Sequence, residues 1–354
     1  MYIKHVSLRN FKNYEDFSFG FEPSGCLIIG NNGIGKTNLL DAISYFTYGR
    51  SVLHVPDQQL INYHAEKFNI KSVFSIDNDD TEFNVSFSKE KKLIRIENNP
   101  LKKLSDLYRL LQVVYSGPDD IFRIFSTPAK RRQFMDMAIS KIFPVYMDFF
   151  RRFKNAHVQR NALLKTNFSP SEKESWDITF CMEAKNIVEY RIKFFDLFKG
   201  FFITAYKMIV QENEEVDIAL KLNFNTDGDF VNEMMKVLHL NLQKEKRHQE
   251  TVVGPHRDDI DILINQKIAL FHASQGQKRS IVIAMKIALA NIITNITGKN
   301  PIMIFDDTLA ELDLSRSNNL LTNMIEKHQI FIASPTSEKY LNLKLPVLEL
   351  HQQI

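Results

Sequence analysis

The sequence has little cysteine, little net charge and no long uninterrupted apolar run. Its two cysteines, Cys26 and Cys181, lie far apart and have no histidine pair at ligand spacing beside them. Such a composition is typical of a reducing compartment and argues against disulfides and a structural zinc site. The N-terminal residues, MYIKHVSLRNF, show no apolar stretch of a signal peptide. The most apolar long segment, SIVIAMKIALANIIT, contains Lys286 and falls short of a membrane span. We therefore expect a soluble, cytoplasmic protein.

The small charge excess also limits the choice of partners. A formal net charge of +3 is too low to indicate a nucleic acid by itself, so a polyanion would have to bind a local basic patch. A length of 354 residues with 44% hydrophobic and 25% charged residues predicts a globular protein of two structural units. No heptad pattern is sustained over several repeats, which argues against a long coiled coil.

Strand-like and helix-like segments divide the chain into two parts. In the first hundred residues, alternating apolar positions predict strands at EDFSFGFE, FNIKSVFSID and LIRIEN. From about Asp119 the sequence becomes poor in glycine and helical in period, with a polar loop expected at NFSPSEKES (167–175). Strand signals return near TVVGPHRDDIDILINQKIAL and again at PIMIFDD, QIFIAS and PVLEL. We predict an α/β fold in which residues 1–120 and 250–354 form one discontinuous domain, interrupted by a helical arm at 121–249.

The segment GNNGIGKTN has the residues of a phosphate-binding loop. Gly30, Gly35, Lys36 and Thr37 match G-x-x-x-x-G-K-[ST] between an apolar strand, GCLIIG, and an amphipathic helix expected to end near Gly49. The glycines allow successive backbone N–H groups to point at phosphate, and the start of the helix adds positive potential. Lys36 would contact the outer phosphates and Thr37 would offer a hydroxyl to Mg²⁺.

Two further motifs complete a nucleotide site. At the end of the apolar strand in PIMIFDD, Asp306 is expected to bind Mg²⁺ and Asp307 to orient the attacking water. Because aspartate is one methylene shorter than glutamate, we predict slow hydrolysis. In ASQGQKRS, Ser274 and Gln277 flank Gly276 at the start of a helix, where they could meet another anion.

The order of these motifs is that of an ABC-type ATPase, in which the signature turn reaches the nucleotide of a second subunit. Within that superfamily the chain resembles the RecF family of bacterial recombination-repair ATPases from residue 8 to about 313. The matching segments are LRNFKNY (8–14), GRS (49–51), RRQFMD (131–136), QRNALLK (159–165), GPHRDD (254–259), SQGQKR (274–279) and FDDTLAELD (305–313). The resemblance implies an SMC-like head, split in sequence, with a short helical arm in place of a coiled coil.

The resemblance also implies roles for individual residues. ATP would bind Gly30, Asn31, Asn32, Gly33, Ile34, Gly35, Lys36 and Thr37. Ser274, Gly276 and Gln277 would close over the ATP of the partner subunit, and Asp313 would contact across the homodimer. Asp306, with Thr37, would hold the metal, and Asp307, with Lys36, would be catalytic. RecF-like proteins act on gapped duplex and single-stranded DNA with RecO and RecR, which implies RecA loading, replication restart and a role in the SOS response.

Some positions depart from the family pattern. Lys12 stands where arginine is usual, which weakens an expected phosphate contact, and Val52 and Leu53 replace an aromatic residue and an arginine. Gln112 and the acids of SGPDD (116–120) are candidates for sensing the γ-phosphate. Where transporters have a switch histidine, this chain offers Ser334 or Thr336. His256 has no cysteine or second histidine near it in the sequence and is left unassigned.

The basic residues of the arm allow two interpretations. They could line a phosphate-binding surface with salt-sensitive affinity. Alternatively they are solvated helix faces, with Arg151 and Arg152 covering apolar neighbours; the resemblance favours DNA. The residues are Arg131, Arg132, Arg151, Arg152, Lys154 and Arg160.

Two other ABC-type machines remain as alternatives. A transporter subunit is disfavoured by SQGQ in place of a doubled glycine and by the missing switch histidine; copurification with a membrane protein would favour it. An ATP-dependent nuclease would need an acid cluster in a further domain, for which we see no counterpart; metal-dependent cutting of DNA would reveal one.

Overall fold

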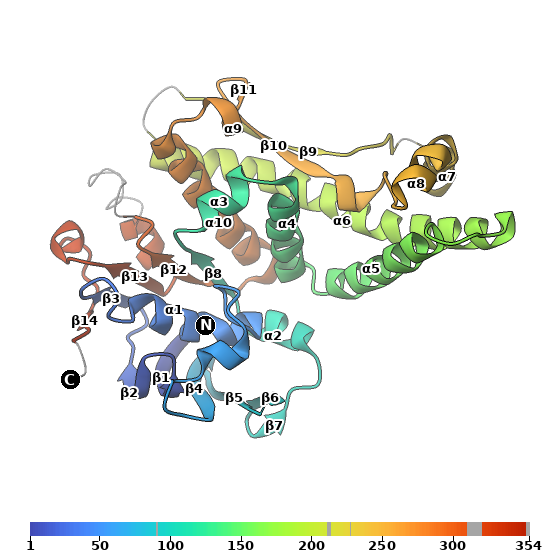
Figure 1. The fold of residues 1–354 in the computed structure, drawn as a ribbon. Helices are drawn as coiled ribbons and strands as arrows, with labels where there is room; N and C mark the ends of the chain where they lie inside the picture. Colours follow the sequence, from blue (N-terminus) through green and yellow to red (C-terminus); the bar gives the residue numbers. More distant parts are fainter. Residues whose placement is uncertain (90, 211–213, 227, 310–320, 352–354) are drawn as a thin grey trace. The chain divides into compact units, whose positions relative to one another are not determined.

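The computed structural model of the chain describes every residue except 90, 211–213, 227, 310–320 and 352–354 (Figure 1). It contains two compact units. Unit 1 comprises residues 1–121, 204–212 and 274–354, and unit 2 comprises residues 122–203 and 213–273. The predicted division differs from this grouping in two places. Residues 250–273 belong to unit 2, where strand β10 (Asp259–Ile264) pairs with β9 (Val216–Lys221), and residues 204–212, predicted to lie in the arm, belong to unit 1.

Unit 1 contains an antiparallel sheet in the order β2-β1-β4-β5-β6-β7. Every second residue of β4 and β5 is buried on one face, and apart from Ser72 in β4 these alternating residues are apolar over the buried parts of both strands, as expected for a sheet with one solvated side. The strands predicted at EDFSFGFE, FNIKSVFSID and LIRIEN are confirmed. The strands are β1 (Tyr2–Phe11), β2 (Tyr14–Gly20), β4 (Lys67–Ile76), β5 (Asp79–Ser88), β6 (Lys91–Ile96) and β7 (Asn99–Pro100).

The second sheet of unit 1 is parallel and positions the candidate site. Its order is β14-β3-β13-β12-β8, and β12 and β13 are buried along their whole length. Such strands read as continuous apolar runs, so the prediction at PIMIFDD succeeded. Strand β8, of only four residues, was not predicted. The strands are β3 (Gly25–Ile29), β8 (Val113–Ser116), β12 (Ile302–Asp306), β13 (Ile330–Ser334) and β14 (Val347–Glu349).

Helix α1 (Lys36–Tyr48) packs against both sheets. It contacts β8, β12 and β13, while its Phe46 ring lies 5.8 Å from the Phe74 ring and 6.1 Å from the Phe83 ring of the antiparallel sheet. Gly49 ends the helix with φ of 61°, as its sequence predicted. The remaining short elements of unit 1 are η1 (Asp57–Leu60), α2 (Leu104–Leu110) and η3 (Glu338–Tyr340).

Helix α10 (Gln275–Thr297) is a core helix. Among the described helices it is the one long and apolar enough to cross a membrane by length and composition, and 72% of that window is buried inside the protein. A buried helix of a globular core passes the same test. Lys286 in its middle is 3% exposed and forms a buried ion pair with Asp120.

Unit 2 is largely helical and also contains a small antiparallel sheet, β11-β10-β9. Strand β9 was missed because it lies inside a stretch that we interpreted as uniformly helical. Helix α3 (Asp120–Phe125) begins in unit 1, and the end of the long helix α6 (Pro170–Ile209) belongs to unit 1. The other elements are α4 (Pro128–Ile142), α5 (Tyr146–Leu163), α7 (Phe230–Leu240), α8 (Leu242–His248), η2 (Pro255–Arg257), β11 (Lys267–Ile268) and α9 (Ala269–His272).

The polar loop predicted at residues 167–175 is wrong for most of its length, because α6 begins at Pro170. Ser169 and Glu172 form a reciprocal cap: the Ser169 N–H donates to the Glu172 carboxylate at 2.8 Å, and the Glu172 N–H donates to Ser169 Oγ at 3.2 Å. Serine, proline and a glutamate three residues on are the signals of a helix N-terminus. Polarity alone therefore misled the prediction.

Candidate functional site

The candidate phosphate loop connects β3 to α1, as the motif requires. Gly35 has φ of 117°, and a Cβ there would lie 2.5 Å from Asn13 Nδ2, so only glycine fits. The Asn13 amide donates to the Ile34 carbonyl at 2.9 Å, and the Tyr14 hydroxyl donates to the Gly35 carbonyl at 3.1 Å. The segment LRNFKNY, one of the segments that match the family, thus donates hydrogen bonds to carbonyl groups of the loop. Sequence reasoning missed this contact, because it joins residues brought together only by the fold.

Lys36 lies across the loop that it is predicted to serve. Its ammonium donates to the Gly30 carbonyl at 2.7 Å and to the Asn31 carbonyl at 3.1 Å. A phosphate would replace these carbonyls as the partner of the charge. A cavity of about 300 Å³ lies at this point and is lined by Asn32, Gly33, Gly35, Lys36, Thr37, Asn38 and Asp307.

A larger cavity, of about 830 Å³, adjoins the first half of the loop. It is lined by the loop, by aromatic residues of the first hairpin and by the C-terminal strand. Its volume is ample for the rest of a nucleotide. The lining residues are Asn13, Tyr14, Phe17, Ile29, Gly30, Asn31, Asn32, Gly33, Ile34, Pro335, Leu348, Glu349, Leu350 and His351.

The two predicted acids differ sharply in environment. Asp306 is fully buried at the end of β12, and the Thr37 hydroxyl donates to its Oδ1 at 3.1 Å. Burial raises the pKa of Asp306, although its hydrogen bonds oppose this shift. Asp307 is exposed with φ of 54°, and partial burial raises its pKa while Lys36 lowers it. The structure therefore brings Lys36, Thr37, Asp306 and Asp307 together.

These side chains suit a hard cation. A hydroxyl within hydrogen-bond distance of a buried carboxylate, beside a phosphate cradle, is an all-oxygen donor set of the kind that Mg²⁺ prefers. Mg²⁺ fits the residues present, with the remaining ligands left to phosphate and water.

The predicted signature turn forms a capping box at the start of α10. Ser274 Oγ accepts from the Gln277 N–H at 3.2 Å, and Gln277 Oε1 accepts from the Ser274 N–H at 2.8 Å. Ser274 and Gly276 are exposed. Within the described part of the chain, neither of the two cavities at the loop is lined by Ser274, Gly276 or Gln277. Asp313 lies outside the described residues.

Several secondary candidates have structural partners. Lys12 Nζ lies 3.3 Å from Asp41, whose carboxylate also accepts from Ser51 Oγ at 2.7 Å and from the Val52 N–H at 2.9 Å. Because Val52 uses its backbone here, the unusual side chain leaves this contact intact. Among the residues considered for γ-phosphate sensing, Gln112 is buried and Asp120 is paired with Lys286. Ser334 is buried and accepts from the Thr336 N–H at 3.4 Å.

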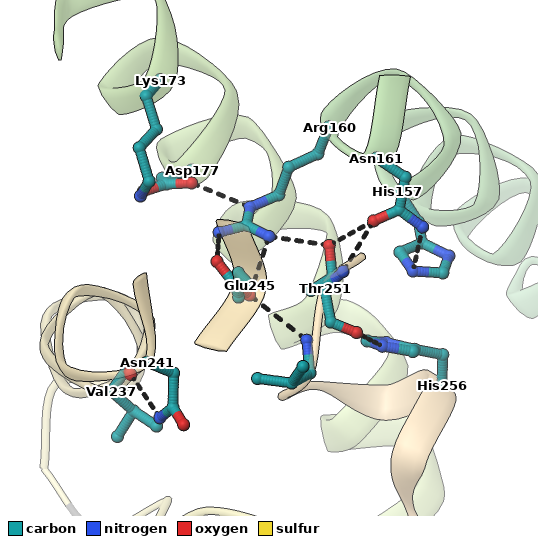
Figure 2. A network of polar contacts seen from close by, with 11 residues as sticks. His157, Arg160, Asn161, Lys173, Asp177, Val237, Asn241, Glu245, Thr251 and His256 are labelled. Atoms are coloured by element: carbon teal, nitrogen blue, oxygen red, sulfur yellow. Dashed lines mark hydrogen bonds and ion pairs between the residues drawn. The ribbon is translucent and has the colours of Figure 1, made fainter. Parts of the chain in front are cut away.

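The structure divides the basic residues proposed for DNA. Arg160 is 1% exposed: it donates to Asp177 at 2.8 Å, to Thr251 at 2.7 Å and to both carboxylate oxygens of Glu245 (Figure 2). Arg131 is 6% exposed and forms a bidentate pair with Asp259. Placing these two on a DNA surface was therefore wrong. Their charges are neutralised by carboxylates distant in the sequence: the half-buried Asp259 for Arg131, and the buried Asp177 and Glu245 for Arg160.

The remaining basic residues are more accessible. The side chains of Arg151 and Arg152 are 73% and 50% exposed, and Lys154 is also exposed. Arg152 lies over the Phe149 ring, 4.8 Å from its centroid, as expected for a cation covering an apolar neighbour. Arg132, half-buried, donates to the Asp258 carbonyl at 2.8 Å. We call Arg151, Arg152 and Lys154 the α5 basic patch.

The GPHRDD segment is a partly buried turn of unit 2, in which Gly254, Pro255 and Asp258 are buried and Arg257 is exposed. Gly254 has φ of 131°, and Arg191 binds the Pro255 carbonyl at 2.6 Å and the Asp258 carboxylate at 2.7 Å. The ring of His256 lies 4.1 Å from that of His157, so a second histidine is close in space although distant in sequence. Burial lowers the pKa of His157 to about 4 and that of His256 to about 3. Both rings are therefore neutral near pH 7.

Comparisons with known proteins agree with this architecture. The family model for the RecF/RecN/SMC N terminal domain matches residues 2–345. The DNA replication and repair protein RecF of Ruminiclostridium cellulolyticum is 32% identical over 356 residues, covering 97% of this chain and 95% of that protein. RecF of Clostridium beijerinckii is 30% identical over 327 residues, covering 92% of this chain and 89% of that protein.

Solved structures agree with the fold. The structure of the recombination mediator protein RecF-ATP in the RecFOR pathway superposes with a TM-score of 0.90 at 25% identity, covering 100% of this chain and 96% of that one. The Smc head bound to the C-winged helix domain of ScpA gives a TM-score of 0.58 at 15% identity, covering 97% and 92%. The predicted ABC-type ATPase head, SMC-like and interrupted by a helical insertion, is thereby confirmed.

Proposed function

Because this chain belongs to the RecF/RecN/SMC N-terminal domain family and is a RecF-like DNA replication and repair protein, we propose that it is an ATP-gated DNA-binding protein. In this proposal ATP closes two heads into a homodimer on DNA near single-strand gaps. Slow hydrolysis then opens the dimer and releases the DNA. The family inferred from the sequence motifs is confirmed over nearly the whole chain.

The observation that carries the proposal is the convergence of Lys36, Thr37 and the buried Asp306 on the phosphate loop. Lys36 would exchange the Gly30 and Asn31 carbonyls for the outer phosphates of ATP, while the backbone N–H groups of residues 30–37 hold the phosphate chain. Mg²⁺, held by Thr37 and Asp306, would neutralise the charge on the phosphates. The larger cavity beside Tyr14 and Phe17 would accommodate the rest of the nucleotide.

Asp307 is the residue we propose to orient the hydrolytic water. It is exposed at the edge of the phosphate cavity and adjoins the metal carboxylate. Its short side chain supports slow turnover, which suits a switch better than a motor. Ser274, Gly276 and Gln277 are proposed to complete the site of the partner subunit. In agreement with this, Ser274 and Gly276 are exposed at the start of α10, and Gln277 lies in its first turn.

The cellular role follows from the family. We propose that DNA-bound protein works with RecR and RecO in the cytoplasm to support RecA loading, replication restart and SOS induction. The α5 basic patch is the candidate contact with the phosphate backbone of DNA.

Binding to gapped duplex DNA with ATP, with ADP and without nucleotide tests the proposal. Binding by wild type should require ATP, should be lost in Lys36→Ala, and should persist longer after ATP addition in Asp307→Asn. Binding that ignores nucleotide, or is absent, would overturn the switch. Cutting of the DNA, or copurification with a membrane protein, would instead favour the nuclease or transporter alternative.

A further inference from the structure

The metal carboxylate has a second partner, Tyr115, that no motif predicted. Tyr115 lies on β8, the neighbour of β12, and its side chain is buried. The Tyr115 hydroxyl donates to Asp306 Oδ2 at 2.7 Å, while Thr37 donates to Oδ1 at 3.1 Å. Each oxygen of the carboxylate therefore has its own donor, and the group cannot rotate without breaking one of these bonds.

The backbone around Tyr115 is itself fixed by buried charges. Lys286 of α10 donates to the Tyr115 carbonyl at 2.7 Å and lies 2.9 Å from Asp120. The same carboxylate accepts from the Gly117 N–H at 2.8 Å. These contacts hold the end of β8 and the turn that follows it, and so fix the point from which the tyrosine side chain reaches Asp306.

Gly117 provides an independent sign that the ring position matters. A Cβ at this residue would lie 2.5 Å from Tyr115 Cε1 and 2.8 Å from the Tyr115 hydroxyl. Any larger residue would have to displace the tyrosine ring, because real Cβ atoms do not approach other atoms so closely. The turn thus leaves space that the ring fills on its way to the carboxylate.

We propose that Tyr115 is a positioning residue that orients the Asp306 carboxylate for Mg²⁺ in the ATP-bound protein. When Thr37 turns its hydroxyl to the metal, Tyr115 remains the donor that holds Oδ2 and leaves Oδ1 directed at the loop. Partners of this kind commonly determine the metal affinity of a site, because they fix the ligand before the metal arrives. This inference rests on the proposed function, since it assumes that the loop binds ATP with Mg²⁺.

The test measures metal dependence separately from nucleotide binding. A fluorescent ATP analogue is titrated onto the full chain in EDTA and then with rising Mg²⁺. Electron paramagnetic resonance of Mn²⁺ follows the bound metal directly. In Tyr115→Phe we expect the half-saturating Mg²⁺ concentration to rise about tenfold, with the affinity in EDTA unchanged. Tyr48→Phe is the matched control: Tyr48 is a buried tyrosine of the same unit whose hydroxyl donates to the Val113 carbonyl at 3.3 Å, away from Asp306.

Two further variants make the result specific. In an Asp306→Asn background, Tyr115→Phe should add no further loss of metal affinity, because the two residues act through one contact. Gly117→Ala keeps the hydroxyl but displaces the ring, so it should weaken metal binding in the same direction; it also serves if Tyr115→Phe does not fold.

The outcomes separate the two proposals. If wild type binds no nucleotide, the proposed function fails. If wild type shows Mg²⁺-dependent binding but Tyr115→Phe titrates within about twofold of it, only the role of Tyr115 is overturned. An equal loss of affinity in EDTA would also overturn it, since that result would mean a general effect on the pocket.

Discussion

Single residues of unit 2 show why charge in a sequence does not predict a charged surface. Arg160 and Arg191 are each 1% exposed. Arg160 donates to the carboxylates of Asp177 and Glu245 (Figure 2). Arg191 donates to the Pro255 carbonyl and the Asp258 carboxylate. Removing one member of such a network leaves the opposite charge unpaired in the protein interior, which solvates a charge poorly. These arginines therefore stabilise unit 2, whereas an exposed ion pair such as Arg151 with Asp148 contributes little to the free energy of unfolding.

We predict that Arg160→Met destabilises the protein by about 3–5 kcal/mol, because Glu245 and Asp177 lose their shared partner. Urea unfolding followed by circular dichroism measures the loss. The control, Arg151→Met, should change the free energy of unfolding by less than about 0.5 kcal/mol. Equal effects of the two substitutions would contradict the assignment of Arg160 to the core.

The stacked histidines predict a pH dependence. His157 and His256 have pKa values of about 4 and about 3 in the fold, lowered mainly by burial from an ordinary value of 6.5. As the pH falls, these histidines bind protons in the unfolded state before they do in the folded state. Their neutral, buried rings therefore lower the free energy of unfolding progressively as the pH falls from 6.5 towards 4 and 3, and cost nothing above pH 6.5. Asp258 works in the opposite direction, because burial raises its pKa to about 6.

The difference between variants isolates the histidines. His157→Phe keeps an aromatic ring in the stack but has no group to protonate. We expect its free energy of unfolding to fall less steeply than that of wild type between pH 6.5 and 4, with the Asp258 contribution common to both. Urea titrations at several pH values measure the slopes; parallel slopes would refute a role for the His157 ring.

At the scale of elements, helix α5 separates structural from accessible charge. Its Arg160 points into unit 2, while the α5 basic patch (Arg151, Arg152 and Lys154) remains at the surface. The same helix thus contains a buried structural arginine and exposed basic residues that can meet a phosphate backbone. Which of these roles applies depends on the face of the helix that each residue occupies.

Replacing the α5 basic patch by alanine should weaken DNA binding and reduce the slope of log affinity against log salt concentration by about two to three. Each phosphate contact contributes about 0.9 to this slope on duplex DNA. The matched control removes three exposed lysines elsewhere in the same unit, Lys185, Lys199 and Lys236. If both triple variants lower the slope equally, the effect is one of net charge and the patch has no special role.

At the scale of the whole molecule, the candidate nucleotide site of one chain does not include the signature turn that we propose to complete it. The loop cavities contain Lys36 and Asp307 but not Ser274 or Gln277, within the described residues. A site shared between two copies would explain this separation, and it makes ATP binding and dimerisation a single coupled equilibrium.

Mixing two inactive variants tests the shared site. Lys36→Ala lacks the phosphate contact and Ser274→Arg blocks the signature turn, so neither should form an ATP-dependent dimer alone. Their mixture contains one composite site in which both parts are intact, and we expect it to regain ATP-dependent dimerisation in light scattering. Failure of the mixture, with ATP binding retained by Ser274→Arg, would contradict a site built from two chains.

Local signals account for the successful predictions. The loop at residues 30–37, the buried strand before Asp306 and the Gly49 helix end all follow from sequence-adjacent residues. The failures involve partners distant in sequence: Arg131 with Asp259, Arg160 with Glu245, and His157 with His256. Residues 167–175 and strands β8 and β9 failed for local reasons: the capping signal of residues 167–175 was outweighed by polarity, β8 is very short, and β9 lies in a stretch interpreted as helical.

The sequence by itself determined the family, the phosphate loop and the order of the motifs, because these depend on short segments with a fixed local geometry. Only the tertiary structure decided which charges are buried, which tyrosine holds Asp306, and which residues of the β1–β2 turn and the start of β2 support the loop. The physical reason is that burial and pairing depend on segments brought together by folding. A carboxylate more than a hundred residues away can neutralise an arginine that the sequence alone would place in solvent.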